Sequence, residues 1–146
     1  MIRNWIWVVC FALLACARET PLPDMQAGEI GRVTKIIDGD GLVLDTGQRV
    51  RLISIVAPVL SPTEGMPEPY SGESARLLED MALGRRVQLF YPGITRDRYD
   101  RALAHIVTLD SAGPQIWLNH EMVARGAARV RLYSSTSARG QDLLSA

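Results

Sequence analysis

Three aspartates and three glycines lie within the stretch IDGDGLVLDTG, residues 37–47, and they form two groupings that could do chemistry. Asp38 and Asp40, with one glycine between them, could supply carboxylate oxygens to a hard cation, which prefers oxygen ligands. The tripeptide DTG that begins at Asp45 could supply one half of an aspartic-protease dyad. Both groupings also fit ordinary turns, because Asp and Gly are favoured where the chain turns between strands.

The protease interpretation needs partners that this chain does not offer. A retroviral-type enzyme requires a later segment of two hydrophobic residues and a glycine, and a homodimer that pairs two aspartates. The one candidate segment, ALG at residues 82–84, falls at the predicted end of a helix. We therefore expect the tripeptide at Asp45 to form a hairpin turn.

The segments around these turns have the pattern of short strands. Residues 31–55 contain three aliphatic, β-branched runs separated by Asp-Gly and Thr-Gly, which are hairpin signals. Alternating apolar runs follow at 85–91 and 101–109, and a shorter one at 114–118. The first three runs predict a meander, and the later ones predict further strands of the same sheet.

Two segments have helical spacing instead. In residues 71–83 the apolar side chains recur every three or four positions, and Ser71 is the expected N-cap. A second helix is predicted at 119–125, with Asn119 as its cap and a glycine just after its end. Strands, a helix, more strands and a helix together predict an α+β fold on a small, mostly antiparallel barrel or sheet.

The N-terminal residues 1–15 have the composition of a secretory signal peptide. A basic residue at position 3 precedes an apolar run that is too short to cross a bilayer, which takes roughly 20 residues. Residues 13–16, LLAC, have the pattern of a bacterial lipobox, whose cysteine is lipidated. A plain signal peptide and an uncleaved anchor are the alternatives.

The leader predicts where the protein resides. We expect a periplasm-facing lipoprotein of the bacterial cell envelope, held to the membrane through lipid on Cys16, or alternatively a secreted protein. Residues 16–30 are polar, contain proline and glycine, and are predicted to form a tether. Residues 31–146 then form one domain, which we expect to be a monomer.

Cysteine usage and charge exclude several classes of site. Both cysteines, Cys10 and Cys16, belong to the leader region, so the domain is predicted to have no disulfide and no thiolate metal site. The formal net charge is zero, unlike that of a dedicated nucleic-acid binder, which is strongly basic. Nearly all the cationic residues are arginines, however, and arginine is the better bidentate ligand for phosphate. A local arginine cluster therefore stays possible.

Several motifs, taken in order, carry a resemblance. DGDGLVL at 38–44 leads through a hairpin into RLISIVAP at 51–58, and DRYDRALAHIV follows at 97–107. This order resembles the staphylococcal nuclease (thermonuclease) family, and NHEMVARGAARV at 119–130 is similar to a helix of that family. The resemblance covers roughly residues 30–133. It implies an OB-fold, a five-stranded barrel with flanking helices, and calcium-dependent cleavage of DNA and RNA phosphodiesters.

The resemblance assigns roles to five residues. Asp40 matches the first calcium carboxylate, and Asp38 matches the aspartate that precedes it. Arg51 and Arg101 match the two catalytic arginines, which would neutralise the charge that develops on the phosphoryl oxygens. Tyr99 matches the tyrosine beside the phosphate.

Four positions depart from the family pattern. Val56 stands where the second calcium carboxylate belongs, and Val59 stands where the catalytic glutamate belongs. Gly41 replaces a threonine, and Asp100 replaces the glycine before the second arginine. The chain thus keeps the phosphate-clamping arginines and lacks most of the metal and general-base carboxylates. We expect a catalytically impaired module that binds nucleic acid or another phosphate-bearing ligand, or that serves as an interaction domain.

The alternative is an active calcium-dependent nuclease. Glu64 or Glu68, in the proline-rich loop at 59–70, would then replace the missing carboxylates, and calcium would be the cofactor. A loop would have to hold these side chains in place for this to work. At the other end, residues 137–146 resemble the start of the family's third helix, which is expected to be truncated here.

Overall fold

The computed structural model of the chain describes residues 22–109, 114–132 and 139–146. The predicted leader, its lipobox and Cys16 lie outside the described residues. Within the described part, no helix is long and apolar enough to cross a membrane.

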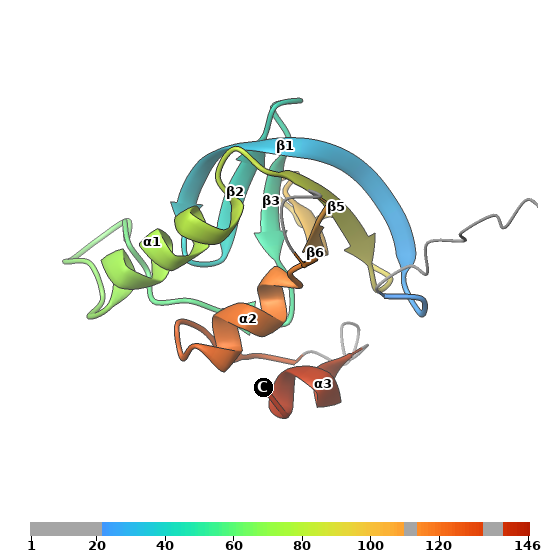
Figure 1. Cartoon of the computed structure of the whole chain (residues 1–146). Coiled ribbons are helices and arrows are strands. Elements are labelled where there is room, and N and C mark those ends of the chain that lie inside the picture. The colour runs from blue at the N-terminus through green and yellow to red at the C-terminus, as the bar shows by residue number, and fades with distance from the viewer. Residues whose placement is uncertain (1–21, 110–113, 133–138) are drawn as a thin grey trace, which may run out of the picture.

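Five strands close into a barrel in the order β1-β2-β3-β6-β5 (Figure 1). All neighbouring pairs are antiparallel except β3 and β6, which run parallel. Closure pairs every strand on both sides, so the barrel has no free edge. This confirms the predicted α+β fold on a small barrel. The strands are β1 (Gln26–Asp38), β2 (Gly41–Leu44), β3 (Arg49–Leu52), β5 (Arg86–Tyr91) and β6 (Ala102–Thr108).

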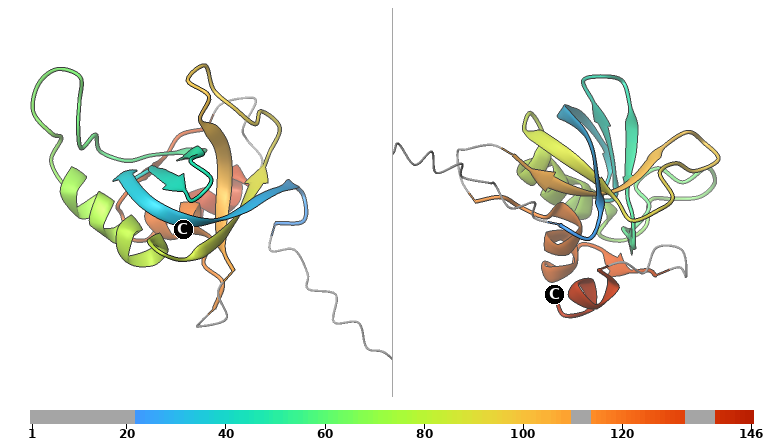
Figure 2. Two further views of the ribbon diagram at one scale, coloured as in Figure 1. Left: turned by 90° about the horizontal axis from the view of Figure 1, so that it is seen from above. Right: turned by 90° about the vertical axis from the view of Figure 1, so that its right-hand side faces the viewer.

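The long first strand begins earlier than expected. β1 starts at Gln26, pairs with β5 along its first half and with β2 along its second half, and so curves across the barrel (Figure 2). Just before it, Leu22 and Met25 are buried against β5 and β6. Residues 22–30 therefore belong to the folded domain, and the predicted tether at 16–30 is too long. The sequence did not predict that this segment is folded, because most of its side chains face solvent and it shows no apolar periodicity.

The tripeptide at Asp45 is a hairpin turn between β2 and β3. Gly47 adopts a φ of 82°, which favours glycine, and its N–H donates to the carbonyl oxygen of Leu44 at 2.9 Å. The Oδ1 atom of Asp45 accepts the backbone N–H of Arg32 at 3.0 Å. The carboxylate is thus used to join this turn to β1, as the turn interpretation predicts.

Three helices gather at one end of the barrel (Figure 1): α1 (Ser71–Ala82), α2 (Leu118–Ala124) and α3 (Gly140–Leu144). They cover that end with buried Leu78, Met122 and Leu143. A two-stranded sheet, β4 (Ile55–Val56) with β7 (Arg129–Val130), ties the segment after β3 to the segment after α2. The loop before α1 extends away from the barrel (Figure 2).

Both predicted N-caps are wrong, and so is the short strand at 114–118. The N-cap of α1 is Tyr70, with a φ of 65°, and Ser71 lies inside the helix. Leu118, expected in the strand, instead begins α2. Asn119 is fully buried: its Oδ1 atom accepts the N–H of Ile106 at 3.0 Å, and its Nδ2 atom donates to the carbonyl oxygen of Ile53 at 2.9 Å. The asparagine side chain therefore links α2 to the barrel by hydrogen bonds and does not cap the helix.

Candidate functional site

The turn between β1 and β2 contains the two predicted metal carboxylates. The Oδ1 atom of Asp38 accepts the backbone N–H of Asp40 at 3.2 Å. Gly39 between them is packed so tightly that a Cβ atom there would lie 2.7 Å from the Cβ of Ala57 and would overlap the Oγ of Ser74 in α1. Only glycine lets this turn lie directly on α1, and the helix in turn fixes the position of both aspartates.

Asp40 is the buried centre of the site. Its side chain is almost fully inaccessible, and its Oδ2 atom accepts two hydrogen bonds of 3.0 Å, from the Nη2 of Arg51 and from the N–H of Ala57. Burial raises the pKa of Asp40 to about 6, although the guanidinium of Arg51 and the N–H of Ala57 favour the ionised form. The Oδ2 atom of this carboxylate is therefore occupied by donors of the protein itself.

Arg51 lies in β3, and Arg101 directly precedes the neighbouring strand β6. β3 and β6 run parallel with Val50 opposite Ala102, and both of these side chains are buried in the barrel. Since side chains alternate along a strand, Arg51 and Arg101, each next to one of them, face outward. Their side chains are 31% and 26% exposed. The barrel thus brings together two cations that are far apart in the sequence.

The loop before β6 positions Arg101 and Tyr99. Asp97 accepts the Nε–H of Arg101 at 2.7 Å through Oδ2, and the backbone N–H groups of Tyr99 and Arg101 through Oδ1. Burial works to raise the pKa of Asp97, but these donors outweigh it and hold the pKa below its ordinary value. Asp97 was not predicted as a site residue, although its i,i+4 spacing to Arg101 was visible in the sequence.

Two further features of this loop bear on the predicted site. Asp100 adopts a φ of 59°, the left-handed conformation that the family's glycine adopts easily and that Asp tolerates better than most residues. The ring of Tyr99 is 60% exposed, with the Cζ of Arg101 5.5 Å from its centroid and that of Arg98 4.7 Å from it. An exposed aromatic ring beside guanidinium groups suits a nucleic-acid ligand.

A calcium site at this place would have to gather oxygen ligands around Asp40. Calcium takes six to eight oxygen ligands, several of them carboxylates. Val56, half-buried in β4 opposite Arg129, offers no oxygen from its side chain. In the part of the chain that the structure describes, no three His, Cys, Asp or Glu side chains come together as a metal site.

Glu68 is held in place more firmly than a flexible loop would allow. Its Oε2 atom accepts the N–H of Val59 at 2.7 Å, and its own N–H donates to the carbonyl oxygen of Val59 at 2.9 Å. These two bonds close the loop at its base and place a carboxylate beside Val59, the position of the family's catalytic glutamate. Glu64 is exposed in the same loop.

Comparison with known proteins agrees with this geometry. A family model described as staphylococcal nuclease homologue matches residues 49–146, more than half of the chain. The chain belongs to the staphylococcal nuclease family. The resemblance seen in the motifs and the barrel expected from it are thereby confirmed.

Two relatives show how far the likeness extends. The thermonuclease of Staphylococcus intermedius is 29% identical over 114 residues, which cover 73% of this chain and 62% of that protein. The thermonuclease of Staphylococcus hyicus is 27% identical over 110 residues, which cover 70% and 59%. The chain thus spans about three fifths of the length of the curated relatives it matches.

Proposed function

We propose that this chain is a nuclease-like module that binds the phosphates of nucleic acid through Arg51 and Arg101 and does not cleave them with calcium. The observation that carries the proposal is the environment of Asp40. Its Oδ2 atom is engaged by Arg51 and by the N–H of Ala57, and the residue expected to complete a cation site is Val56. A single buried carboxylate already paired with a guanidinium is a poor start for a calcium site.

The arginines keep enough donors to bind a phosphate. A guanidinium has five N–H groups, and the pair with Asp40 uses the Nη2 of Arg51 while the pair with Asp97 uses the Nε of Arg101. The side chains of Arg51 and Arg101 are 31% and 26% exposed, and strand alternation directs both toward the outside of the barrel. Phosphate oxygens match this planar, bidentate geometry.

Binding of a labelled single-stranded oligonucleotide, followed by fluorescence anisotropy, tests the proposal. Arg101→Ala should weaken binding about tenfold, since a hydrogen bond to a charged group is worth about 1.5–3 kcal/mol. Arg76→Ala is the matched control, because it removes the same charge from the exposed side of α1. Equal losses in the two variants would refute a phosphate clamp at Arg101.

A second candidate function is a working nuclease that uses Glu68. The two hydrogen bonds between Glu68 and Val59 support it, because they hold a carboxylate beside the residue that stands at the position of the family's glutamate. Cleavage of single-stranded DNA in calcium, stopped by a chelator and by Glu68→Gln, would establish this second function. Our proposal predicts no calcium-dependent cleavage by the unmodified chain.

We also propose that the protein is anchored to the bacterial envelope through Cys16. The support is the sequence LLAC after a short apolar run. Expression with labelled palmitate should label the protein, and Cys16→Ser should abolish the label. An unlabelled protein recovered from the soluble periplasmic fraction would contradict the anchor.

A further inference from the structure

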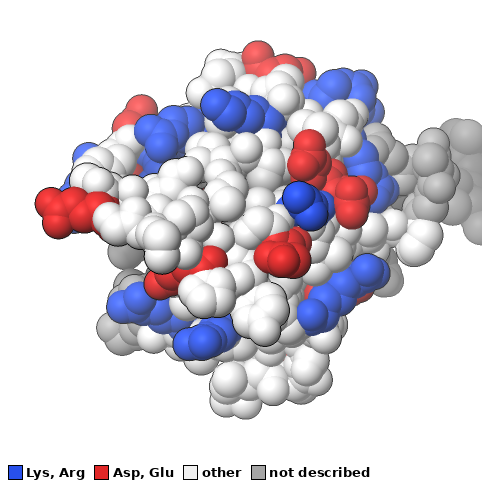
Figure 3. All heavy atoms as spheres, turned by 90° about the vertical axis from the view of Figure 1, so that its left-hand side faces the viewer, with Lys and Arg blue, Asp and Glu red and all other residues white. Residues whose placement is uncertain are grey.

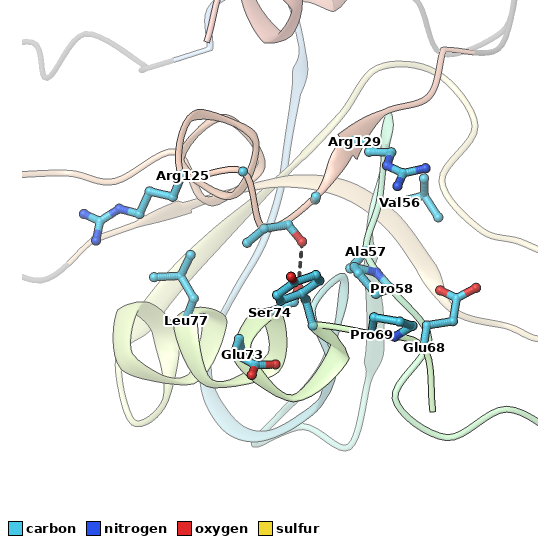
Figure 4. A pocket seen from close by; sticks show the side chains of 14 residues that line it. Val56, Ala57, Pro58, Glu68, Pro69, Glu73, Ser74, Leu77, Arg125 and Arg129 are labelled. Carbon is cyan, nitrogen blue, oxygen red and sulfur yellow. Dashed lines mark hydrogen bonds between the residues drawn. The ribbon is translucent and has the colours of Figure 1, made fainter. Parts of the chain in front are cut away.

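A pocket of about 750 Å³ opens beside the predicted site, between α1 and the connection from α2 to β7 (Figure 4). Residues 56–58, 68–70 and 125–129 and the first turns of α1 line it; we call it the α1 pocket. Its size falls in the range of pockets that hold small organic groups, about 300–1,000 Å³. Pro58 and Leu77 give it apolar surface.

The α1 pocket adjoins the arginine site through a shared wall. Ala57 lines the pocket, and its backbone N–H donates to Asp40. The same carboxylate also accepts a hydrogen bond from Arg51. Ser74 lines the pocket too, and it lies against Gly39 of the aspartate turn. Arg51 and the α1 pocket are therefore close neighbours, and a strand whose phosphate is held by Arg51 would have the pocket within reach.

Charges of both signs line the pocket. Glu73 extends from α1, Glu68 lies in the preceding loop beside Pro69, Arg129 lies beside Val56, and Arg125 points away (Figure 4). On the face of the molecule that Figure 3 shows, basic and acidic side chains are interspersed among uncharged ones. The two glutamates disfavour a phosphate inside the pocket, whereas a group that donates hydrogen bonds is attracted to them.

Tyr70 adds an aromatic ring to the wall of the pocket. It is 77% exposed, although large aromatic rings are usually buried, and its φ of 65° holds the backbone in a conformation that Tyr rarely adopts. A ring in this position offers a face on which a planar base can stack.

From these features we propose that the α1 pocket receives a nucleobase with an exocyclic amino group. The proposal rests on the proposed function, since the arginines must hold the phosphate of the same strand. The Oε2 atom of Glu68 accepts the N–H of Val59, and its second carboxylate oxygen can accept a hydrogen bond from the amino group of cytosine. Thymine presents a carbonyl oxygen at that place, which a carboxylate repels. Cytosine should thus bind better than thymine.

Short oligo(dC) and oligo(dT) strands make the test, because the two pyrimidines have the same size and differ where Glu68 would contact them. We expect oligo(dC) to bind about five times more tightly, since one good base-edge contact is worth about 1–3 kcal/mol of discrimination. Glu68→Gln should remove this preference, because an amide can donate to thymine. Glu79→Gln, on the exposed side of the neighbouring helix α1, is the control and should preserve it.

A base-free strand of the same length separates this inference from the proposed function. If all three strands bind equally and Arg101→Ala weakens all of them, the arginines bind phosphate and the α1 pocket takes no base. If none of the strands binds, both proposals fall. Tyr70→Gly, which also relieves the unfavourable φ, should weaken oligo(dC) several-fold and leave the base-free strand unchanged.

Discussion

At the scale of single residues, Asp40 shows how burial changes what a carboxylate can do. Exposed beside other carboxylates it would be a cation ligand, but here it is enclosed and bonded to Arg51 and to the N–H of Ala57. Val56 and Val59 stand at the two positions where the family resemblance predicts further acidic residues. The same arginine that would serve a phosphate is therefore also the counter-ion of this aspartate.

If missing carboxylates are the cause of missing calcium binding, restoring them should restore it. The double variant Val56→Asp with Val59→Glu should bind calcium with a dissociation constant on the order of 10⁻⁴–10⁻³ M, the range of weak calcium sites. It should be made together with Arg129→Ala, because Arg129 lies opposite Val56 and would pair with the new carboxylate. Isothermal titration with calcium is the measurement.

The uncharged pair Val56→Asn with Val59→Gln, in the same Arg129→Ala background, is the control for this experiment. It adds polar atoms of the same size without the charge and should show no calcium binding. Calcium binding by the unmodified chain at the same strength would show that the valines are not the defect.

At the scale of elements, the close approach of the aspartate turn to α1 is the contact that builds the site. Gly39→Ala would place a methyl group 2.7 Å from the Cβ of Ala57 and into the Oγ of Ser74, so the turn and the helix must separate. We expect a loss of about 1–3 kcal/mol in the free energy of unfolding, as for other overpacked positions, measured by urea denaturation.

Gly72→Ala is the matched substitution for Gly39→Ala. Gly72 lies in the first turn of α1, and a Cβ atom there meets nothing within 4 Å. Alanine should stabilise the helix by about 0.5–1 kcal/mol. Similar losses of stability in the two variants would argue that the packing of Gly39 against α1 is unimportant.

The elements that the sequence predicted well are those with a strong local pattern. The meander at 31–55 and the helix at 71–83 follow from alternation and from helical spacing, and both are present. The prediction of Asn119 as an N-cap failed because its side chain forms hydrogen bonds with the backbone of Ile106 and Ile53. These residues are distant in the sequence, and local sequence preferences do not predict such contacts. The predicted start of the first strand was too late because the outward-facing side chains at the beginning of β1 are mostly polar or small.

The candidate site also has features that the sequence predicts and features that only the folded chain shows. Asp40, Arg51 and Arg101 could be proposed as site residues because they belong to motifs that are contiguous in the sequence. The bonds that define their state join separate segments, such as Asp40 to Ala57 and Glu68 to Val59, and only the folded chain brings these together. The sequence thus predicts which residues would bind a phosphate, and the fold determines which of their atoms already have partners.

At the scale of the whole molecule, His105 and Arg139 connect the barrel to both ends of the described domain. His105 is fully buried in β6 and accepts a hydrogen bond from the Nε1 of Trp117 at 3.2 Å. Arg139 pairs with Asp24 before β1 at 2.8 Å and with Asp142 in α3 at 3.0 Å. These contacts make the packing at this end of the barrel sensitive to the charge of the histidine.

The contribution of His105 to stability should therefore fall as the solution is acidified. Burial, and then the charge of Arg139, lower the pKa of His105 to about 4 from an ordinary value of 6.5. Between these two pH values the unfolded chain binds the proton and the folded chain does not, so lowering the pH favours unfolding by up to about 3 kcal/mol. Asp40, whose pKa is raised to about 6, acts in the opposite direction over the same range.

The contribution of His105 is isolated by comparison with a variant. His105→Asn keeps an acceptor for Trp117 and removes the titrating ring. Urea unfolding at about pH 7 and at about pH 4.5 should show a smaller acid-induced loss of stability for the variant than for the unmodified chain. Equal losses would mean that the buried histidine does not contribute to the acid sensitivity.

The most direct test of the central claim is a time course of fluorescence anisotropy with a labelled single-stranded oligonucleotide, in calcium and in chelator. The anisotropy reports binding, and it falls if the strand is cut into fragments that tumble faster. A module that binds phosphate through Arg51 and Arg101 without a cation predicts the same elevated, constant anisotropy in both solutions. Anisotropy that rises only in calcium, or that decays in calcium and stays constant in chelator, would contradict it.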